Sequence, residues 1–471
     1  MENTFPAFAG RIVIIGFGSI GQGVLPLILR HLAVPSERIV IVTADERGHA
    51  VADAYGVRFV NDPLTPDNYR DRLAPLLGEG DFLLNLSVDV SSLALVELAW
   101  ERGAFYLDTC IEPWAGGYTD PALTPSQRSN YALREAALAL GRHGAGRPTA
   151  LVTHGANPGL VSHLVKQALL DVARDTGVAA PVPAGRSEWA DLARRLGIKA
   201  IHIAERDTQV AAGRPKAVGE FVNTWSVEGF VGEGLQPAEL GWGTHERHWP
   251  DDARRHETGR DCAIYLMRPG AATQVRSWAP AAGPFHGFLI THSEAISIAD
   301  YFTVAEGGRA AYRPTVHYAY HPCDDAVLSL HELAGGGWRM QPEMRLMGAE
   351  ITAGVDELGV LLMGHAKGAY WYGSQLSIAE ARRLAPHNNA TALQVTATVL
   401  AGMAWVLENP RRGLVEPDEM NYRRILDLCR PYLGRLVGAY TDWTPLAGRG
   451  ALFPEDVDRD DPWQFKNFRV M

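Results

Sequence analysis

The sequence predicts an α/β fold, in which a doubly wound parallel sheet of the Rossmann type is followed by a second α+β domain. A β-branched run at 11–17 (RIVIIGF) ends in the glycine-rich turn GFGSIG. Apolar runs then alternate with helical segments as far as about residue 157, whereas β-rich segments dominate beyond residue 175. Strands that alternate with helices form parallel sheets through right-handed crossovers, and the change of pattern marks a new domain.

The first half of the chain carries the alternation. The apolar runs predict strands at 11–17, 38–42, 57–60, 82–87, 105–109 and 150–153. Helices are expected to begin near Ser19 and to cover 91–102 and 159–175. Short β-branched runs that end at glycine or polar residues are typical of buried parallel strands.

The turn after the first strand has the spacing of a phosphate-binding loop. Gly16 allows the tight turn, Gly18 lets the backbone approach a pyrophosphate, and Gly21 allows the helix to pack closely on the strand. Free N–H groups at the start of the helix then face the phosphates. We therefore predict that NAD is bound at this turn, by Gly16, Gly18, Ser19, Ile20 and Gly21.

The end of the second strand leaves the choice between NAD and NADP open. An acid about 20 residues after the glycine loop is expected to bind the ribose hydroxyls of NAD. That position is Thr43, which is followed by Asp45, Glu46 and Arg47. The acid is displaced and an arginine follows it, so the motif alone does not select one dinucleotide.

Polar residues follow the other strands of this half. Ligands of such sheets lie beyond the carboxyl ends of the strands, so we place Ser87, Asp89, Glu112 and Asn157 near the cofactor. Asn157 has two interpretations. It could cap the helix at 159–175, with Pro158 in the first turn, or it could lie beside the nicotinamide.

The second half reads as an α+β domain. A short helix is expected at 187–196, and β-rich segments at 199–205, 220–225, 263–267 and 288–292. Three patches there are dense in ionisable and aromatic groups, namely Glu205, Arg206 and Asp207; Trp225, Glu228, Glu233, Glu239 and Trp242; and His292, Glu294 and Asp300.

These patches indicate a site for a cation. Glu205 ends an apolar strand, and His292 and Glu294 are expected on one face of a strand. Buried carboxylates are costly unless they are paired or bind a ligand, and tryptophan offers a cation–π face to an ammonium group. Each group alone is better explained as a structural partner of an arginine, and it is their combination that indicates a cation site.

The length of 471 residues predicts two or three domains. We expect an NAD-binding domain over 1–157 and a substrate and dimerisation domain over 158–387, with the substrate in the cleft between them. A helical part over about 388–471 is expected to return to the first domain. Its apolar segment 388–409, which Asn389 could cap, is predicted to be a core helix.

The composition narrows the class of partner. It is 46% hydrophobic and 21% charged, which is typical of a globular protein, and the net charge of −10 argues against nucleic acid. The four cysteines and the histidines form no metal-binding motif, so we expect reduced thiols, no metal and a cytoplasmic location. The N-terminal apolar run is too short to span a membrane, and no membrane partner is expected.

Long strings along nearly the whole chain resemble the bacterial homospermidine synthase family, within the saccharopine-dehydrogenase-like group. They include GFGSIGQG, NLSVDVSS, DTCIEPW, GANPG, IHIAERDTQ, NTWSVEGFVGEG, THSEAISIAD, GVDELGVLLMGHAKGAYWYGSQLS and YTDWTPLAG. The resemblance implies a homodimeric transferase. It would join two putrescines, or spermidine and putrescine, into homospermidine with release of ammonia or diaminopropane, and its NAD would be reduced and reoxidised in place.

The resemblance also implies roles for single residues. Asn157 would lie beside the nicotinamide and the reacting amine, and Glu205 and Glu233 would hold ammonium groups. Trp225 would give a cation–π face, and His292, completed by Glu294, would transfer a proton. Asp89 and Glu112 would lie near the cofactor or at the edge of the site.

Two other functions remain open from the residues. The first is a net NAD(P)-dependent dehydrogenase of a saccharopine-like or carboxylated polyamine conjugate, whose substrate carboxylates call for Arg or Lys. The candidate segments are instead rich in glutamate. The second is an inactive protein that binds NAD or polyamines.

Overall fold

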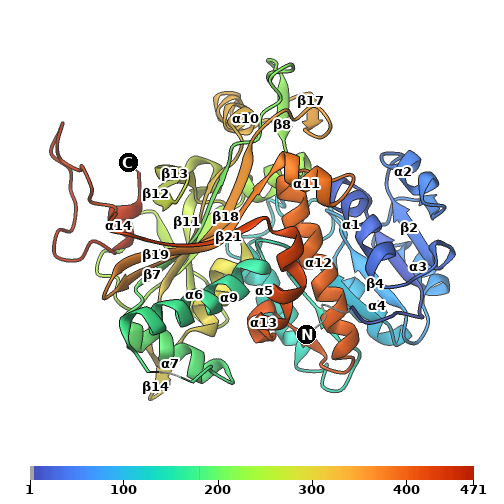
Figure 1. Cartoon of the computed structure of the whole chain (residues 1–471), viewed down its shortest axis with the longest axis horizontal. Helices are drawn as coiled ribbons and strands as arrows, with labels where there is room; N and C mark the ends of the chain where they lie inside the picture. Colours follow the sequence, from blue (N-terminus) through green and yellow to red (C-terminus); the bar gives the residue numbers. More distant parts are fainter. Residues whose placement is uncertain (1–4, 180, 471) are drawn as a thin grey trace.

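The first domain is a seven-stranded sheet in which every pairing is parallel. The computed structural model describes residues 5–179 and 181–470. Figure 1 shows most of this sheet on the right, in blue and cyan. The strand order is β20 (Leu414–Val415), β6 (Ala150–Leu151), β5 (Phe105–Asp108), β4 (Phe82–Asn85), β1 (Ile12–Ile15), β2 (Ile39–Thr43) and β3 (Arg58–Asn61).

Helices cover both faces of this sheet, which explains why its central strands are apolar throughout. Ile12 and Ile14 pack in one core with residues of α1 (Ser19–His31), α6 (Leu160–Thr176) and α12 (Ala390–Glu408). Val13 and Ile15 face a second core, which contains residues of α4 (Ser92–Arg102). Successive side chains of a strand point to opposite faces, so both faces need a cover. The predicted Rossmann fold class is confirmed.

The second domain is built on a ten-stranded mixed sheet. Within the described residues, its only parallel pair joins β16 to β7. The path runs through β10 (Ala253–Arg255), β11 (Ala263–Pro269), β9 (Pro237–Gly241), β16 (Thr315–His321), β7 (Ala200–Asp207), β18 (Val355–His365), β19 (Gly368–Ser377) and β21 (Arg435–Thr441), with β12 (Gln274–Ala279) and β13 (Gly283–Phe288) attached through β16.

Smaller elements complete the second domain and its junction with the first. Helix α6 contacts β18 and β19, and α9 (Ser293–Tyr301) contacts β9 and β16. A two-stranded sheet of β8 (Glu220–Asn223) and β17 (Glu343–Leu346) lies beside α8 (Val227–Leu235). The other elements are α2 (His49–Ala54), α3 (Tyr69–Leu73), α5 (Asn130–Gly141), α7 (Arg186–Leu196), α10 (Asp324–Gly335), α11 (Ile378–Leu384), α13 (Tyr422–Cys429), α14 (Phe465–Phe468), β14 (Val304–Glu306) and β15 (Arg309–Tyr312).

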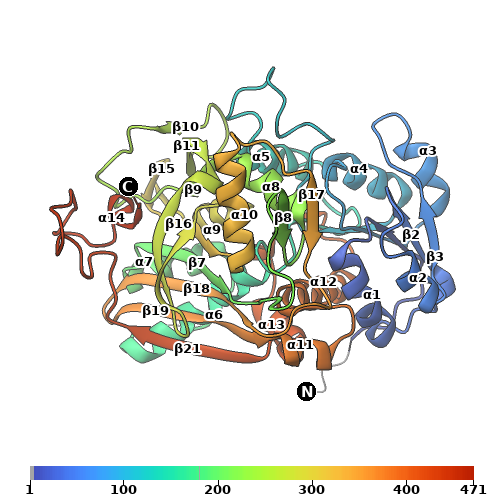
Figure 2. The same ribbon diagram turned by 90° about the horizontal axis from the view of Figure 1, so that it is seen from above.

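The segment 388–471 is divided between the two sheets rather than returning to the first as a whole. Helix α12 packs on α1 and also contacts β18 and β19, and β20 adds an edge strand to the first sheet. Strand β21 instead pairs with β19, and α14 lies against β12 (Figures 1 and 2). Edge strand β19 offers unpaired backbone groups, which β21 satisfies.

Helix α12 is the predicted core helix. The Asn389 Oδ1 accepts a hydrogen bond from the Ala392 N–H at 2.8 Å, which confirms the predicted cap. The helix is long and apolar enough to cross a membrane by length and composition, but 89% of its apolar window is buried inside the protein. Its apolar character is therefore explained by packing between the two domains.

Two predicted strands of the second domain were wrong in extent. The strand expected at 288–292 ends at Phe288, and residues 293–301 form helix α9. The run 288–292 is too short for its periodicity to place the end of the strand, and the helix that follows is buried at every residue, its polar residues included. The strand expected at 220–225 ends at Asn223. The long strands β18 and β19 were not predicted.

Candidate active site

A cavity of about 440 Å³ lies where the carboxyl ends of the parallel strands meet the second domain. All predicted site residues except Gly21 and Glu294 line it, and both domains contribute. From the first domain come Gly16, Gly18, Ser19, Ile20, Ser87, Asp89, Glu112 and Asn157; from the second come Glu205, Trp225, Glu233 and His292.

The glycine loop forms one wall, and its geometry fits a dinucleotide pyrophosphate. Gly16 has φ +80°, and a Cβ there would lie 2.7 Å from the Ser87 Cα, so only glycine fits between β1 and β4. A Cβ on Gly18 would meet nothing within 4 Å, which leaves its backbone open to the cavity. Gly21 packs against the loop instead, since its Cβ would lie 3.0 Å from the Gly16 carbonyl oxygen.

The ribose end of the cavity is lined by the residues that follow β2. Thr43, Asp45 and Arg47 all line it. Asp45 is the nearest acid to the strand end, and its carboxylate accepts from the Arg47 N–H at 2.7 Å and from Nε at 2.9 Å. The Arg47 hydrogen bonds lower the pKa of Asp45. An acid does reach this end, two residues beyond Thr43.

Asn157 does not cap the following helix. The N-cap of α6 is Gly159, at φ +125°, where no side-chain cap bond forms. The Gly155 N–H donates to the Pro158 carbonyl at 2.8 Å, so the segment turns tightly and directs the Asn157 side chain into the cavity. Its Nδ2 donates to the Glu205 Oε2 at 2.8 Å and contacts the Tyr318 hydroxyl at 2.5 Å. The capping interpretation was wrong.

The carboxyl of Glu205 is buried, and its pKa is raised. It lies on β7, is 2% exposed, and also accepts a hydrogen bond from the Tyr318 hydroxyl of the neighbouring strand β16. Burial raises the pKa of Glu205 to about 7, against the lowering by its two hydrogen-bond donors. A carboxyl with a pKa near neutrality can take up and release protons at physiological pH.

Two further buried carboxyls, those of Asp207 and Asp356, lie next to Glu205 on strands β7 and β18. Only Asp207 was singled out from the sequence. Asp207 follows on the same face of β7, and Asp356 of β18 is paired with it in register. Both are fully buried, and burial raises the pKa of each. Asp356 is the second residue of the strand VDELGVLLMGH, which was not predicted from the sequence, so the strand-end reasoning that singled out Glu205 did not reach it. Tyr318 was also missed.

His292 lies between two glutamates. Its Nε2 is 3.0 Å from the Glu233 Oε2, and its Nδ1 is 3.3 Å from the Glu294 Oε1. Burial would lower the pKa of His292, but Glu233 and Glu294 raise it well above its usual value. A doubly protonated imidazole donates through both nitrogens, so in this state His292 cannot act as a base. His292 and Glu294 begin helix α9 and do not share a strand face as predicted.

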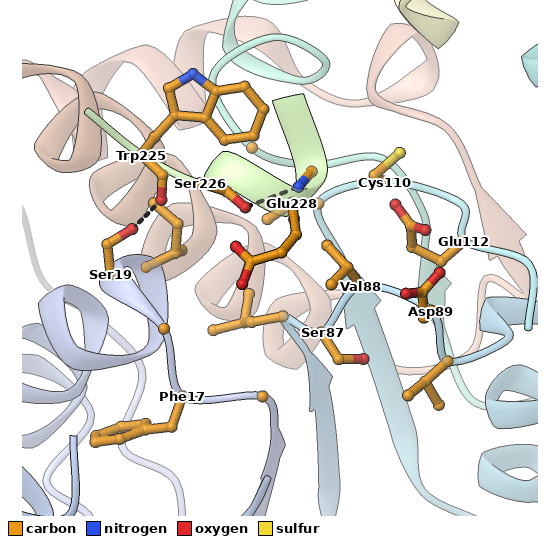
Figure 3. A pocket seen from close by; sticks show the side chains of 18 of the residues that line it. Phe17, Ser19, Ser87, Val88, Asp89, Cys110, Glu112, Trp225, Ser226 and Glu228 are labelled. Carbon is orange, nitrogen blue, oxygen red and sulfur yellow. Dashed lines mark hydrogen bonds between the residues drawn. The ribbon is translucent and has the colours of Figure 1, made fainter. Parts of the chain in front are cut away.

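Glu112 and Asp89 form a second acidic group on the same cavity wall (Figure 3). Burial and the nearby Glu233 raise the pKa of Glu112 to about 8. Burial and Glu228 raise the pKa of Asp89. Carboxyls that repel one another in this way are stabilised in the charged form by a cationic ligand.

Trp225 lies at the junction of the two domains. Its carbonyl oxygen accepts a hydrogen bond from the Ser19 hydroxyl, and Ser226 caps α8 through the Gly229 N–H at 3.0 Å (Figure 3). The indole is half-buried, and its Nε1 lies 3.4 Å from the Tyr320 hydroxyl. The ring therefore flanks the cavity close to the glycine loop.

Three residues of the predicted polar patches serve other purposes. Glu239 accepts from the Asn130 N–H at 2.9 Å and from Thr291 at 2.8 Å, so it anchors the start of α5. Trp242 packs against the rings of Trp249 and Phe465. Asp300 pairs with Arg134 at 2.8 Å and also with Arg186. None of the three lines the cavity.

The cavity wall is strongly acidic, and Arg47 is the one arginine or lysine among its described lining residues. Arg47 is itself paired with Asp45 and with Glu228. Carboxylates, an indole face and a neutral amide next to a dinucleotide loop suit a protonated amine as the second ligand.

Known proteins carry the same architecture. Residues 12–151 match the saccharopine dehydrogenase NADP binding domain, and residues 155–441 match the saccharopine dehydrogenase C-terminal domain. The chain is 59% identical to a homospermidine synthase of Blastochloris viridis, over 98% of this chain and 97% of the relative. It is 53% identical to one of Mesorhizobium japonicum, over 98% and 96%. A crystal structure of homospermidine synthase from Legionella pneumophila in complex with NAD superposes over the full length of both chains, with 50% identity and a TM-score of 0.93.

Proposed function

We infer that this chain, which belongs to the homospermidine synthase family of the saccharopine dehydrogenase-like group, joins two putrescines into homospermidine with release of ammonia. Spermidine could replace one putrescine, with release of diaminopropane. The observation that carries the proposal is the cavity itself, which both the dinucleotide loop and a set of carboxyls line.

The site residues suit the first half of the reaction. Bound NAD would supply a hydride acceptor for the carbon that bears the amine, and a hydride donor for the new imine. The amine must lose a proton before that carbon can release a hydride. We propose Glu205 as the proton acceptor, because its pKa is about 7 and its carboxylate is held by Asn157 and Tyr318.

The second half needs anionic and aromatic groups along the path of the amines. We propose that Glu233, Glu112 and Asp89 hold the ammonium end of the diamine, since all three line the cavity and, in addition to burial, the charges of Glu233 and Asp89 raise the pKa of Glu112. Trp225 would stabilise the cationic imine through its indole face. Neutralisation by the diamine would also relieve the repulsion that raises the pKa of Glu112.

We propose that His292 positions Glu233 and donates a proton rather than accepting one. Its imidazole lies between Glu233 and Glu294, and the two carboxylates favour its protonated form. When the second amine has attacked the imine carbon, the departing amine needs a proton to leave as ammonia. A protonated His292 could supply it through the Glu233 carboxylate.

Water must be kept from the imine while it waits for the second amine. The Ser19 hydrogen bond to the Trp225 carbonyl and the ion pair of Arg47 with Glu228 both join the two domains across the cavity. These contacts support a site that is closed during the reaction.

The alternative, a dehydrogenase of a carboxylated conjugate, is not favoured. Such a substrate needs a cationic side chain for each of its carboxylates. Of the described residues that line the cavity, Arg47 is the one arginine or lysine, and it lies at the ribose end. His292 is already paired with Glu233 and Glu294. The wall near the reacting groups would repel a carboxylate.

The test is to incubate the full chain with putrescine and a catalytic amount of NAD⁺. Homospermidine and ammonia should form in equal amounts while little NADH accumulates. Stoichiometric NADH without homospermidine would contradict the proposal, as would faster turnover of carboxylated amines than of putrescine.

We further propose that the protein is a homodimer and lies in the cytoplasm. The four cysteines, all within the described residues, are free thiols, which supports a reducing compartment. Size-exclusion chromatography with light scattering would test the oligomeric state.

A further inference from the structure

The loop after β2 presents an arginine to the ribose end of the cavity, and two carboxylates hold that arginine. The Arg47 Nη2 lies 2.7 Å from the Asp45 Oδ2, and its Nη1 lies 3.2 Å from the Glu228 Oε1. The Arg47 side chain is 69% exposed, so these ion pairs rather than burial set its position. Asp45 belongs to the first domain and Glu228 to the second.

The position of Glu228 is fixed by the local structure of its own domain. Ser226 caps helix α8, and Glu228 lies in the first turn of that helix. The Ser19 hydrogen bond to the Trp225 carbonyl brings this turn against the glycine loop. Figure 3 shows the Glu228 side chain projecting from α8 into the pocket, on the side of the glycine loop. The charge at the ribose end is therefore set by both domains.

This end of the cavity is where two dinucleotides differ. In Rossmann domains a carboxylate near the end of the second strand accepts hydrogen bonds from the ribose of NAD, whereas an arginine binds the 2′-phosphate of NADP. The loop offers both Asp45 and Arg47. Because Arg47 is already paired twice, its charge is not free for a phosphate.

We propose that Glu228 is a cofactor-specificity residue, which together with Asp45 keeps Arg47 paired and so makes the chain select NAD over NADP. The proposal deepens the proposed function. It rests on the binding of a dinucleotide and is independent of the diamine chemistry.

The sign of the charge supports the proposal. The set has a net charge of −1, because Asp45 and Glu228 are negative and Arg47 is positive. A 2′-phosphate, with a charge of about −1.5 to −2, would be repelled by this set. Replacing both carboxylates by amides would leave Arg47 as the single charge of the set and would turn the repulsion into attraction.

The experiment is a binding titration on the full chain without diamine, after bound nucleotide has been removed. The dissociation constants of NAD⁺ and NADP⁺ are measured by calorimetry for the parent, Glu228→Gln, Asp45→Asn and the double variant. We expect each substitution to lower the ratio Kd(NADP⁺)/Kd(NAD⁺) about ten-fold, from the loss of one repulsive charge near the phosphate. In Glu228→Gln the change should come from tighter NADP⁺ binding.

A third substitution tests the part played by the arginine. Adding Arg47→Ala to the double variant should abolish the gain in NADP⁺ affinity. Glu46→Gln is the matched control: Glu46 is the neighbouring carboxylate, but it binds Asn61 at 2.8 Å outside the cavity, and its removal should leave the ratio unchanged.

Two results would overturn the proposal. One is an equal change in the affinities for NAD⁺ and NADP⁺ in Glu228→Gln, which would make Glu228 a residue that only closes the pocket. The other is a gain in NADP⁺ affinity that survives the loss of Arg47. Failure of the parent chain to bind either dinucleotide would contradict the proposed function instead, which separates the two failures.

Discussion

The Asn157 side chain donates a hydrogen bond to the Glu205 carboxylate at 2.8 Å and so connects the two sheets of the protein. Asn157 follows β6 of the first sheet, and Glu205 lies on β7, a central strand of the second sheet. The bond therefore joins the dinucleotide-binding edge to the group that we propose as the proton acceptor.

Glu205→Gln should lower the turnover of putrescine by about 100-fold or more, because a general base contributes roughly 10²–10⁴ to the rate. The affinity for NAD⁺ should change little, since within the described residues the hydrogen bonds of Glu205 go to Asn157 and Tyr318 and not to the glycine loop. Steady-state kinetics and calorimetric titration measure the two effects. Retention of near-parent turnover would exclude Glu205 as the base.

The pH profile tests the same assignment through Asn157. If deprotonated Glu205 is the active form, kcat/KM should rise with pH through about 7, the pKa of Glu205. Asn157→Ala removes a donor that lowers this pKa, so the acid limb should move to higher pH. An acid limb that stays in place in Asn157→Ala would contradict the assignment, even if turnover falls.

Trp225→Ala should raise the KM for putrescine more than Trp225→Phe does. A cation–π contact is worth about 0.5–2 kcal/mol, and phenylalanine keeps an aromatic face. Both variants keep the backbone carbonyl that binds Ser19, so the contact between the domains is a shared control. Equal losses in the two variants would remove the cation–π role.

Glu233→Gln should reduce turnover by about ten-fold or more and should lower the pKa of His292, because one of its two carboxylate partners is lost. The pKa is measured by NMR of ¹⁵N-labelled histidine. The binding of NAD⁺ should be retained. Loss of NAD⁺ binding together with turnover would indicate that Glu233 is a structural residue.

The stability of the ligand-free protein should depend on Glu112. Its pKa is about 8 in the folded chain and near 4.5 when unfolded, so the folded state binds more protons between these values. Raising the pH through this window therefore destabilises the fold. Glu112→Gln removes the effect, and its Tm should exceed the parent's by at least about 2 °C at pH 8.5 but not at pH 5.

Thermal unfolding of the parent and of Glu112→Gln at several pH values measures the difference in Tm between them. Glu37→Gln, at an exposed position, is the control. Its difference in Tm from the parent should be the same at every pH. Saturating putrescine should shrink the advantage of Glu112→Gln, because the bound ammonium stabilises the charged carboxylate. If Glu112→Gln raised the Tm by the same amount at all pH values, the increase would not come from ionisation of Glu112.

Much of the first domain could be predicted from local patterns. The glycine loop, the buried strands and the cap at Asn389 depend on residues that are close in the sequence, and the structure has each of them. The second domain was less predictable, because β7, β16 and β18 pair across more than a hundred residues. Short apolar runs such as the one that begins at Phe288 are also too short for periodicity to distinguish a strand from a buried helix.

By itself the sequence determined that the chain has a dinucleotide loop, and that carboxylates, a histidine and a tryptophan follow it in segments typical of an amine site. Only the tertiary structure decided what each of these groups does. The structure shows that Asn157 binds Glu205 and does not cap a helix, and that His292 lies between two glutamates. It also identifies Tyr318 and Asp356 as neighbours of the site. Proton affinity and pairing depend on burial and on neighbours a few ångströms away, and long-range strand pairing creates those neighbours.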